Sequence, residues 1–240
     1  MHLLRYCFIA ILLLPSGFAT YGQIVGDTVI VSVGKQSIRL PTPSGYVNAW
    51  ENYPNLRSAF EINETENNQM LAIFAPLSSI PALNSGKYLG FPHYTKVSVS
   101  KSLATLDISE TQFTQFVDLF EKKIGSEFKT SGPDTKKVVT EIKRDLGKHL
   151  WTDASFELKD SVYLGPISRT KHTFVSAAIL AVGGIGKNIA VYNVTALVLV
   201  RSRILFVYFY ANIQSGTDLD MFNAEAKKIV DALLVTNPAR

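Results

Sequence analysis

The stretch 189-IAVYNVTALVLVRSRILFVYFYANI-213 decides the fold of this chain. It is apolar almost throughout, apart from the basic interruption Arg201-Ser202-Arg203 near its middle. A helix that spans a bilayer needs about 20 predominantly apolar residues, and an Arg at its centre costs roughly 2.5–3.5 kcal/mol. The two arms are rich in Val, Ile, Tyr and Phe, which strands prefer. We therefore predict a β-hairpin that turns at Arg201-Ser202 and places both arginine charges in solvent.

Both alternating sets of side chains in this hairpin are apolar. A sheet with one face in water alternates apolar and polar residues, so both faces of these strands must be covered by protein. The connections between the strands are too short for parallel crossovers, which predicts antiparallel neighbours. The predicted fold class is therefore α+β, with an antiparallel β-sheet flanked by α-helices on both faces, an α/β/α sandwich.

The rest of the chain supplies strands and helices for such a sandwich. Ser109 with Gln112 forms a capping box before one amphipathic helix, Asp134 can cap a second that ends at Gly147, and a last helix starts near Thr217 or Asp218. A short helix with Pro54 in its first turn is expected over 54–62. Strands are expected over 27–33 and 36–41, joined by a turn that begins at Gly34, and over 69–75, 94–102, 155–163, 169–182, 188–200 and 203–213. The segment 76–93 is expected to be irregular.

The N-terminal stretch 1-MHLLRYCFIAILLLPSGFATYGQ-23 has the three parts of a secretory signal peptide. Arg5 precedes the apolar run 6–14, and small residues follow. We predict a signal peptide over 1–19, with cleavage at 22 as the alternative, and a single globular domain over 20–240. The mature chain is then exported, periplasmic or secreted, and has no transmembrane segment. Its only cysteine, Cys7, leaves with the signal peptide.

The charge of the chain is mildly basic, with a formal net charge of +4. Lys and Arg are scattered among nearby Asp and Glu, whereas a nucleic-acid surface needs a concentrated basic face. We therefore expect no nucleic-acid partner.

Sequence motifs for catalysis or metal binding are absent. The histidines after residue 20 are His93, His149 and His172, without HExxH or a Cys pair, so no metal site is predicted. Gly-x-Ser-x-Gly is also absent. The run 183-GGIGK-187 is followed by a strand pattern instead of the helix that a phosphate loop needs, which indicates a hairpin turn. We predict no catalytic residue and no cofactor.

The order of elements, with the phrase 38-IRLPTPSGY-46 after the first hairpin, resembles the PsbP-like superfamily. Its members include the extrinsic protein of the plant oxygen-evolving complex and the Ran-binding Mog protein of yeast. The resemblance covers roughly residues 27–235. It implies a non-catalytic domain that binds other proteins or helps to assemble them, and it assigns no functional residue.

The segment 76–93 is the predicted binding region, because long loops in compact domains are usually functional. Lys87, Tyr88, Phe91 and His93 are its candidate binding residues, with the two aromatic side chains as anchors for a protein partner. The alternative is that this segment folds back and seals one end of the sheet. The predicted function is an exported, non-catalytic protein-binding or assembly factor of the cell envelope. The alternative function is an envelope hydrolase whose site is assembled from residues distant in sequence.

Overall fold

The structure is a computed structural model that describes residues 28–62, 66–85, 91–127, 129–130, 162–184, 187–213 and 218–238. These ranges do not include the predicted signal peptide, the helix after Asp134, the strand residues 155–161 or the candidate residues Lys87 and Tyr88. Within the described ranges, no helix is both long enough and apolar enough to cross a membrane.

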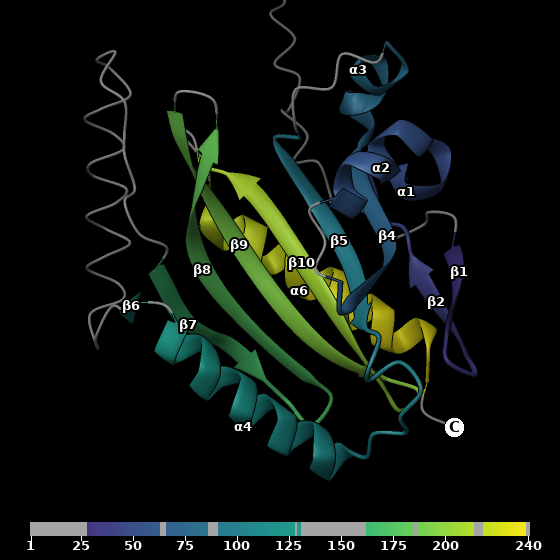
Figure 1. The fold of residues 1–240 in the computed structure, drawn as a ribbon, viewed down its shortest axis with the longest axis vertical. Helices are drawn as coiled ribbons and strands as arrows, with labels where there is room; N and C mark the ends of the chain where they lie inside the picture. Colours follow the sequence, from purple (N-terminus) through teal and green to yellow (C-terminus); the bar gives the residue numbers. More distant parts are fainter. Residues whose placement is uncertain are drawn as a thin grey trace, which may run out of the picture.

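A twisted sheet of eight strands forms the centre of the molecule, in the order β3-β4-β5-β10-β9-β8-β7-β6 (Figure 1). Neighbouring strands are antiparallel, except that the short β6 runs parallel to β7. The predicted antiparallel sheet is thus confirmed. The strands are β3 (Tyr46–Asn48), β4 (Asn68–Pro76), β5 (His93–Ser100), β6 (Lys129–Thr130), β7 (Val162–Arg169), β8 (Thr173–Gly184), β9 (Lys187–Val200) and β10 (Arg203–Asn212).

The β9–β10 hairpin turns at Arg201 and Ser202, as predicted, with Val200 opposite Arg203. The expectation that both arginine charges lie in solvent is wrong for Arg203, which is 3% exposed. Its Nη1 donates to the carbonyl of Leu106 and to Oδ1 of Asp107, each at 2.6 Å. A guanidinium can be buried here because carbonyl and carboxylate oxygens replace the water that it loses.

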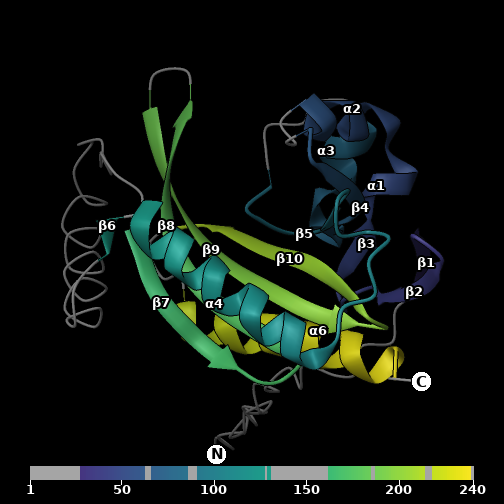
Figure 2. The same cartoon turned by 60° about the horizontal axis from the view of Figure 1, so that its bottom comes forward.

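Helices cover both faces of the sheet, which confirms the predicted sandwich. Helix α4 (Glu110–Glu127) lies on one face and helix α6 (Leu219–Thr236) on the other (Figure 2). Val198 packs in the cluster on the α6 side, and Leu197 packs with Phe113 on the α4 side. The alternation along β9 therefore sends successive apolar side chains into two separate cores.

The predicted starts of α4 and α6 are confirmed by their caps. The backbone N–H of Ser109 donates to the Gln112 side chain at 2.8 Å, and the Ser109 hydroxyl accepts from the Gln112 backbone at 3.2 Å, which is the reciprocal capping box. At α6, Oδ1 of Asp218 accepts from the backbone N–H groups of Asp220 and Met221. These local signals fix where both helices begin.

Three short helices, α1 (Ala49–Asn52), α2 (Pro54–Ile62) and α3 (Ile80–Asn84), lie near β4 (Figure 1). The expectation that 76–93 is irregular is wrong for its first part. A 3₁₀ turn over Leu77–Ser79 leads into α3, where Pro81 in the first turn has the backbone angle that a helix needs.

Strand β7 departs from the prediction, which ended one strand at 163 and began the next at 169. One strand instead runs over Val162–Arg169, through Gly165 and Pro166. Register shifts occur around both residues, and β6 pairs only with the first two residues of β7. The rest of β7 is an edge strand within the described chain, and an edge with bulges tolerates Pro and Gly.

The predicted first hairpin is confirmed as β1 (Thr28–Val33) and β2 (Gln36–Pro41), which form a two-stranded sheet of their own. Strand β2 is tied to the end of α6, because Oδ1 of Asn237 accepts from the Arg39 backbone at 2.8 Å and its Nδ2 donates to the Arg39 carbonyl at 2.6 Å. Val33 and Ile38 are fully buried in the core on the α6 side. The β1–β2 hairpin is thus held to the rest of the domain by the buried side chains on one of its faces and by the hydrogen bonds of β2 to Asn237.

Candidate binding site at the end of the sheet

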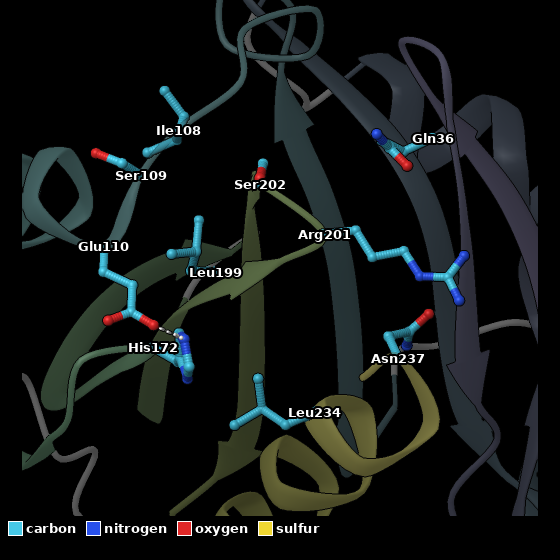
Figure 3. Close-up of a pocket in the computed structure, with 10 residues that line it drawn as sticks. All are labelled: Gln36, Ile108, Ser109, Glu110, His172, Leu199, Arg201, Ser202, Leu234 and Asn237. Atoms are coloured by element: carbon cyan, nitrogen blue, oxygen red, sulfur yellow. Dashed lines mark hydrogen bonds and ion pairs between the residues drawn. The ribbon is translucent and has the colours of Figure 1, made fainter. Parts of the chain in front are cut away.

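A pocket of about 370 Å³ opens at the end of the sheet where β9 turns into β10 (Figure 3). Five separate parts of the chain meet there: β2, the start of α4, the β7–β8 turn, the β9–β10 turn and the end of α6. The sheet topology and the two hairpins bring them together, although they are distant in sequence. The lining residues are Gln36, Ile108, Ser109, Glu110, His172, Leu199, Arg201, Ser202, Leu234 and Asn237.

The pocket has an apolar middle and polar groups at two opposite sides (Figure 3). Leu199 and Leu234 lie between the two sides, and Leu199 is 7% exposed. Glu110 and His172 stand at one side, with Arg201 at the other. Such a surface suits a ligand that has an apolar body and polar groups at both ends.

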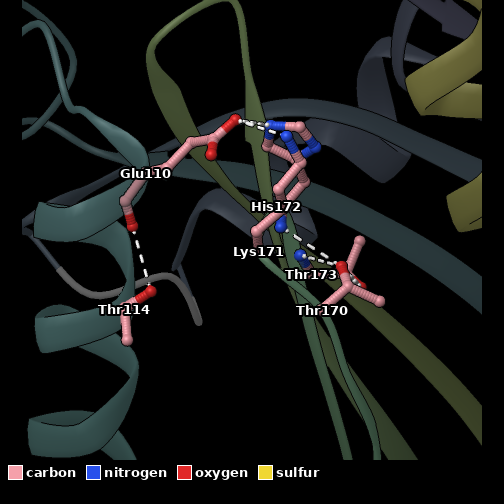
Figure 4. Close-up of polar contacts among 6 residues, drawn as sticks. All are labelled: Glu110, Thr114, Thr170, Lys171, His172 and Thr173. Atoms are coloured by element: carbon pink, nitrogen blue, oxygen red, sulfur yellow. Dashed lines mark hydrogen bonds and ion pairs between the residues drawn. The ribbon is translucent and has the colours of Figure 1, made fainter.

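Glu110 is the centre of a cluster of charged groups (Figure 4). Its Oε1 accepts from Nζ of Lys171 at 3.0 Å and lies 2.8 Å from Nε2 of His172. The Lys171 hydrogen bond, assisted by His172, lowers the pKa of Glu110 below its usual range, so the carboxylate stays ionised at neutral pH. The Thr170 hydroxyl accepts from the backbone N–H of His172 and of Thr173, which fixes the turn that carries Lys171 and His172.

The Glu110–His172 pair resembles a base with its orienting carboxylate, but covalent catalysis also needs a side-chain nucleophile within reach of the ring. Among the hydrogen bonds of the described residues, the His172 ring contacts Glu110 and no hydroxyl or thiol. Ser109 lines the same pocket, but its hydroxyl is engaged in the α4 cap. The described residues also contain no group of side chains that could hold a metal ion. The arrangement is suited to binding polar groups.

Arg201 places a guanidinium at the other side of the pocket, and only some of its N–H donors are hydrogen-bonded. Its Nη1 donates to the carbonyl of Ser37 at 2.7 Å, which links the β9–β10 turn to β2. Its Nε is buried and has no acceptor within the described part of the chain. The ion pairs of the described residues give Arg201 no carboxylate partner.

A second feature is the outer edge of β1, at the rim of the molecule (Figure 1). Within the described residues β1 pairs with β2 alone. Val33 and Gln36 flank a two-residue turn and so form a hydrogen-bonded pair, after which bonded and non-bonded pairs alternate. Ser32, Ile30 and Thr28 therefore direct their N–H and C=O groups away from β2.

The side chains of β1 leave this edge accessible. Thr28, Ile30 and Ser32 are exposed, and Ile30 is 64% exposed. The strand has no charged residue, no Pro and no shift in its register with β2. Proteins usually protect an edge strand with charged residues, Pro or shifts in register, and β1 has none of the three. The strand is therefore open to pairing with another chain.

The structure describes two of the four residues predicted to bind a partner. Lys87 and Tyr88 lie outside the described residues. Phe91 is 4% exposed and packs against Phe60, as the alternative of a packing segment expects. The His93 ring lies edge-on to the Tyr46 ring. Burial lowers the pKa of His93, and the negative charge of Glu225 on α6 partly opposes this shift. A binding role for the segment stays a prediction.

Sequence reasoning missed Glu110, Arg201 and Ile30 as candidate site residues. Arg201-Ser202 carried a signal, because a two-residue hairpin turn with both φ angles positive favours Asn-Gly. The alternation of residues along β1 was also visible, but the sequence did not show that β1 pairs with β2 alone among the described strands. The contact of Glu110 with His172 spans 62 residues and had no local signal.

No protein-family model matches the chain, and no curated protein matches it. Among solved structures, the Ran-binding protein Mog1p of Saccharomyces cerevisiae is similar, with a TM-score of 0.34 and 10% identity over 88% of this chain and 92% of that chain. A point mutant of protein Mog1 has a TM-score of 0.32 and 11% identity over 88% of this chain and 93% of its own. The antiparallel sheet with helices on both faces, which the order of elements led us to expect, rests on the structure itself.

Proposed function

We propose that this chain is an exported, non-catalytic protein-binding or assembly factor of the cell envelope, and that its partner adds a strand to β1. The open edge of β1 is the observation that carries this proposal. A row of unpaired backbone N–H and C=O groups is complementary to the backbone of another extended chain. Such an edge therefore selects a polypeptide over other classes of partner.

The dimensions of the edge favour a short extended segment of another protein. Strand β1 has six residues, of which three direct their backbone groups outward. Stable dimers bury about 1,200–2,000 Å² in total, much more than one short strand provides. Since β1 is uncharged and Ile30 is exposed at its middle, the matching segment carries an apolar residue opposite Ile30.

The proposed export rests on the N-terminal sequence. Arg5, the apolar run 6–14 and the small residues that follow form the pattern of a signal peptide. Loss of Cys7 with that segment leaves a mature chain without cysteine, which must be held by its core. The large core found on both sides of the sheet is consistent with such a domain.

The alternative of a hydrolase is favoured by one observation, the Glu110–His172 pair assembled from distant parts of the chain. A covalent mechanism would require a side-chain nucleophile beside the His172 ring, which the described residues do not supply, so His172 would act as a general base on water. Hydrolysis of activated ester and amide substrates by the mature protein and by His172→Ala separates the two functions. Activity that depends on His172 would favour the enzyme.

Site-specific photo-crosslinking in the native envelope tests strand addition. A photoreactive amino acid is placed at position 30 on β1 and, as the control, at Leu119 on α4, which is similarly exposed at 69%. We expect one discrete protein adduct from position 30 that is absent from position 119. The same adducts at both positions, or none at position 30, would contradict the proposal.

A second arm separates backbone pairing from simple proximity. With the photoreactive group at Ser32, Ile30→Lys should abolish the adduct, because a Lys on the edge opposes strand pairing. Leu119→Lys introduces the same charge on α4 and should leave the adduct unchanged. Melting temperatures close to that of the parent protein would show that both variants fold.

A further inference from the structure

We propose that the sheet-end pocket binds the C-terminus of a polypeptide, whose carboxylate pairs with Arg201 and whose last side chain lies on Leu199 and Leu234. The identification of the ligand as a polypeptide rests on the proposed protein-binding function. The pocket is distinct from the β1 edge, so the two sites can be tested separately.

The guanidinium of Arg201 is the main determinant for a carboxylate. Only its bond to the Ser37 carbonyl is made within the described structure, and its buried Nε has no acceptor. The Nε is inaccessible from the pocket, whereas Nη2 makes no hydrogen bond among the described contacts and is the donor left for a ligand. A carboxylate is planar and can take two guanidinium donors together, which makes it the natural partner.

The backbone at Arg201 supports a role beyond the turn itself. Arg201 and Ser202 have φ angles of 48° and 61°, in the left-handed region that residues with a Cβ rarely adopt. Asn-Gly would fit this turn with less strain. A strained backbone of this kind motivates the hypothesis that the Arg201 side chain has a function.

The apolar middle of the pocket favours a ligand with an apolar side chain. Leu199, Leu234 and Ile108 are the apolar residues that line the pocket, and the volume of about 370 Å³ lies within the range of ligand pockets. A free inorganic anion would leave this apolar surface in water. An apolar C-terminal side chain would cover it while its carboxylate reaches Arg201 (Figure 3).

The opposite side of the pocket accepts a hydrogen-bond donor. Glu110 receives Lys171 and His172 on Oε1 alone, which leaves Oε2 without a partner among the described contacts. A peptide backbone provides N–H donors at fixed spacing from its terminal carboxylate. The negative charge of Glu110 also disfavours a dianion such as phosphate in the same pocket, so a monoanionic carboxylate fits better.

Fluorescence polarisation with defined peptides tests this inference on the mature protein. The probe is a fluorescein-labelled tetrapeptide with three Ala and a C-terminal Leu, prepared as the free acid and as the C-terminal amide. Loss of a charge-assisted pair should weaken binding of the amide roughly 10- to 100-fold relative to the acid. Equal binding of the two probes, or no binding of either, would overturn the inference.

Arg201→Asn distinguishes a binding role from a structural one. Asn suits the left-handed turn, so the melting temperature should stay the same or rise while the preference for the free acid disappears. Arg201→Lys should keep part of the preference, because the charge remains. The control Arg57→Ala removes an exposed arginine that pairs with Glu61 elsewhere and should change nothing. A normal acid preference in Arg201→Asn would contradict the assignment.

Two further arms identify the source of the carboxylate and separate this inference from the proposed function. Octanoate that competes as well as the free peptide acid would indicate a fatty-acid site and overturn the assignment to a peptide. Ile30→Lys should leave the acid preference intact, since β1 does not line the pocket. Crosslinking from position 30 without any acid preference would leave the proposed function standing and refute the pocket alone.

Discussion

Replacement of Arg203 by Met probes the polar network that closes the sheet end. Met retains an unbranched apolar chain but removes a guanidinium that is 3% exposed. The change leaves the carbonyl of Leu106 without its 2.6 Å donor, and the Val33 carbonyl without its longer bond at 3.4 Å. Asp107 also loses its partner, but its side chain is 79% exposed and can be hydrated instead.

The expected destabilisation follows from these contacts. Hydrogen bonds to charged groups contribute about 1.5–3 kcal/mol each, and apolar burial of the Met side chain offsets part of the loss. We therefore expect Arg203→Met to lower the free energy of unfolding by about 2–4 kcal/mol. For a domain of this size, that corresponds to a fall in melting temperature of about 4–16 °C.

Urea unfolding followed by circular dichroism measures the effect in Arg203→Met, Asp107→Ala and the double variant. Asp107→Ala should be much milder, because an exposed carboxylate contributes little to an ion pair. The double variant should resemble Arg203→Met. Unfolding of Arg203→Met at the same urea concentration as the parent, or an equal loss in Asp107→Ala, would refute the reasoning.

Three other predictions concern a buried strand, a turn and a histidine. Val198→Asp places an unpaired charge at a fully buried position and should cost more than about 4 kcal/mol or prevent folding, as seen in urea unfolding. Gly34→Ala should lower the melting temperature more than Gly45→Ala, because both have positive φ but only a Cβ at Gly34 collides with the Ala104 carbonyl. Burial lowers the pKa of His93 from its ordinary value of 6.5, so the unfolded chain takes up a proton at this residue more readily than the folded chain. The stability that neutral His93 contributes above pH 6.5 is therefore lost as the pH falls through the lowered pKa. His93→Gln should make the melting temperature depend less on pH over that range.

The features that the sequence predicted correctly depend on neighbours along the chain. The β9–β10 hairpin was predicted because Arg201-Ser202 interrupts two apolar arms, and the start of α4 because Ser109 and Gln112 cap it reciprocally. The apolar character of both faces of β9 and β10 further required helices on both sides of the sheet.

The features that the sequence did not predict depend on contacts between distant segments. Arg203 is buried because Leu106 and Asp107 come from a loop about a hundred residues earlier. Pro166 lies in a strand because this part of β7 is an edge within the described chain, which no local pattern indicates. The pocket forms only when β2, two other hairpin turns and two helix ends meet, so Arg201 and Glu110 could not be placed together in advance.

Amide hydrogen exchange along β1, measured by NMR, tests the proposed binding edge most directly. In the isolated domain the amides of Ile30 and Ser32 should exchange fast, whereas those of Val29 and Val31, which pair with β2, should be protected. In the complex with the protein captured at position 30, Ile30 and Ser32 should become protected as well. Protection of Ile30 already in the isolated domain, or its continued fast exchange in the complex, would contradict strand addition at β1.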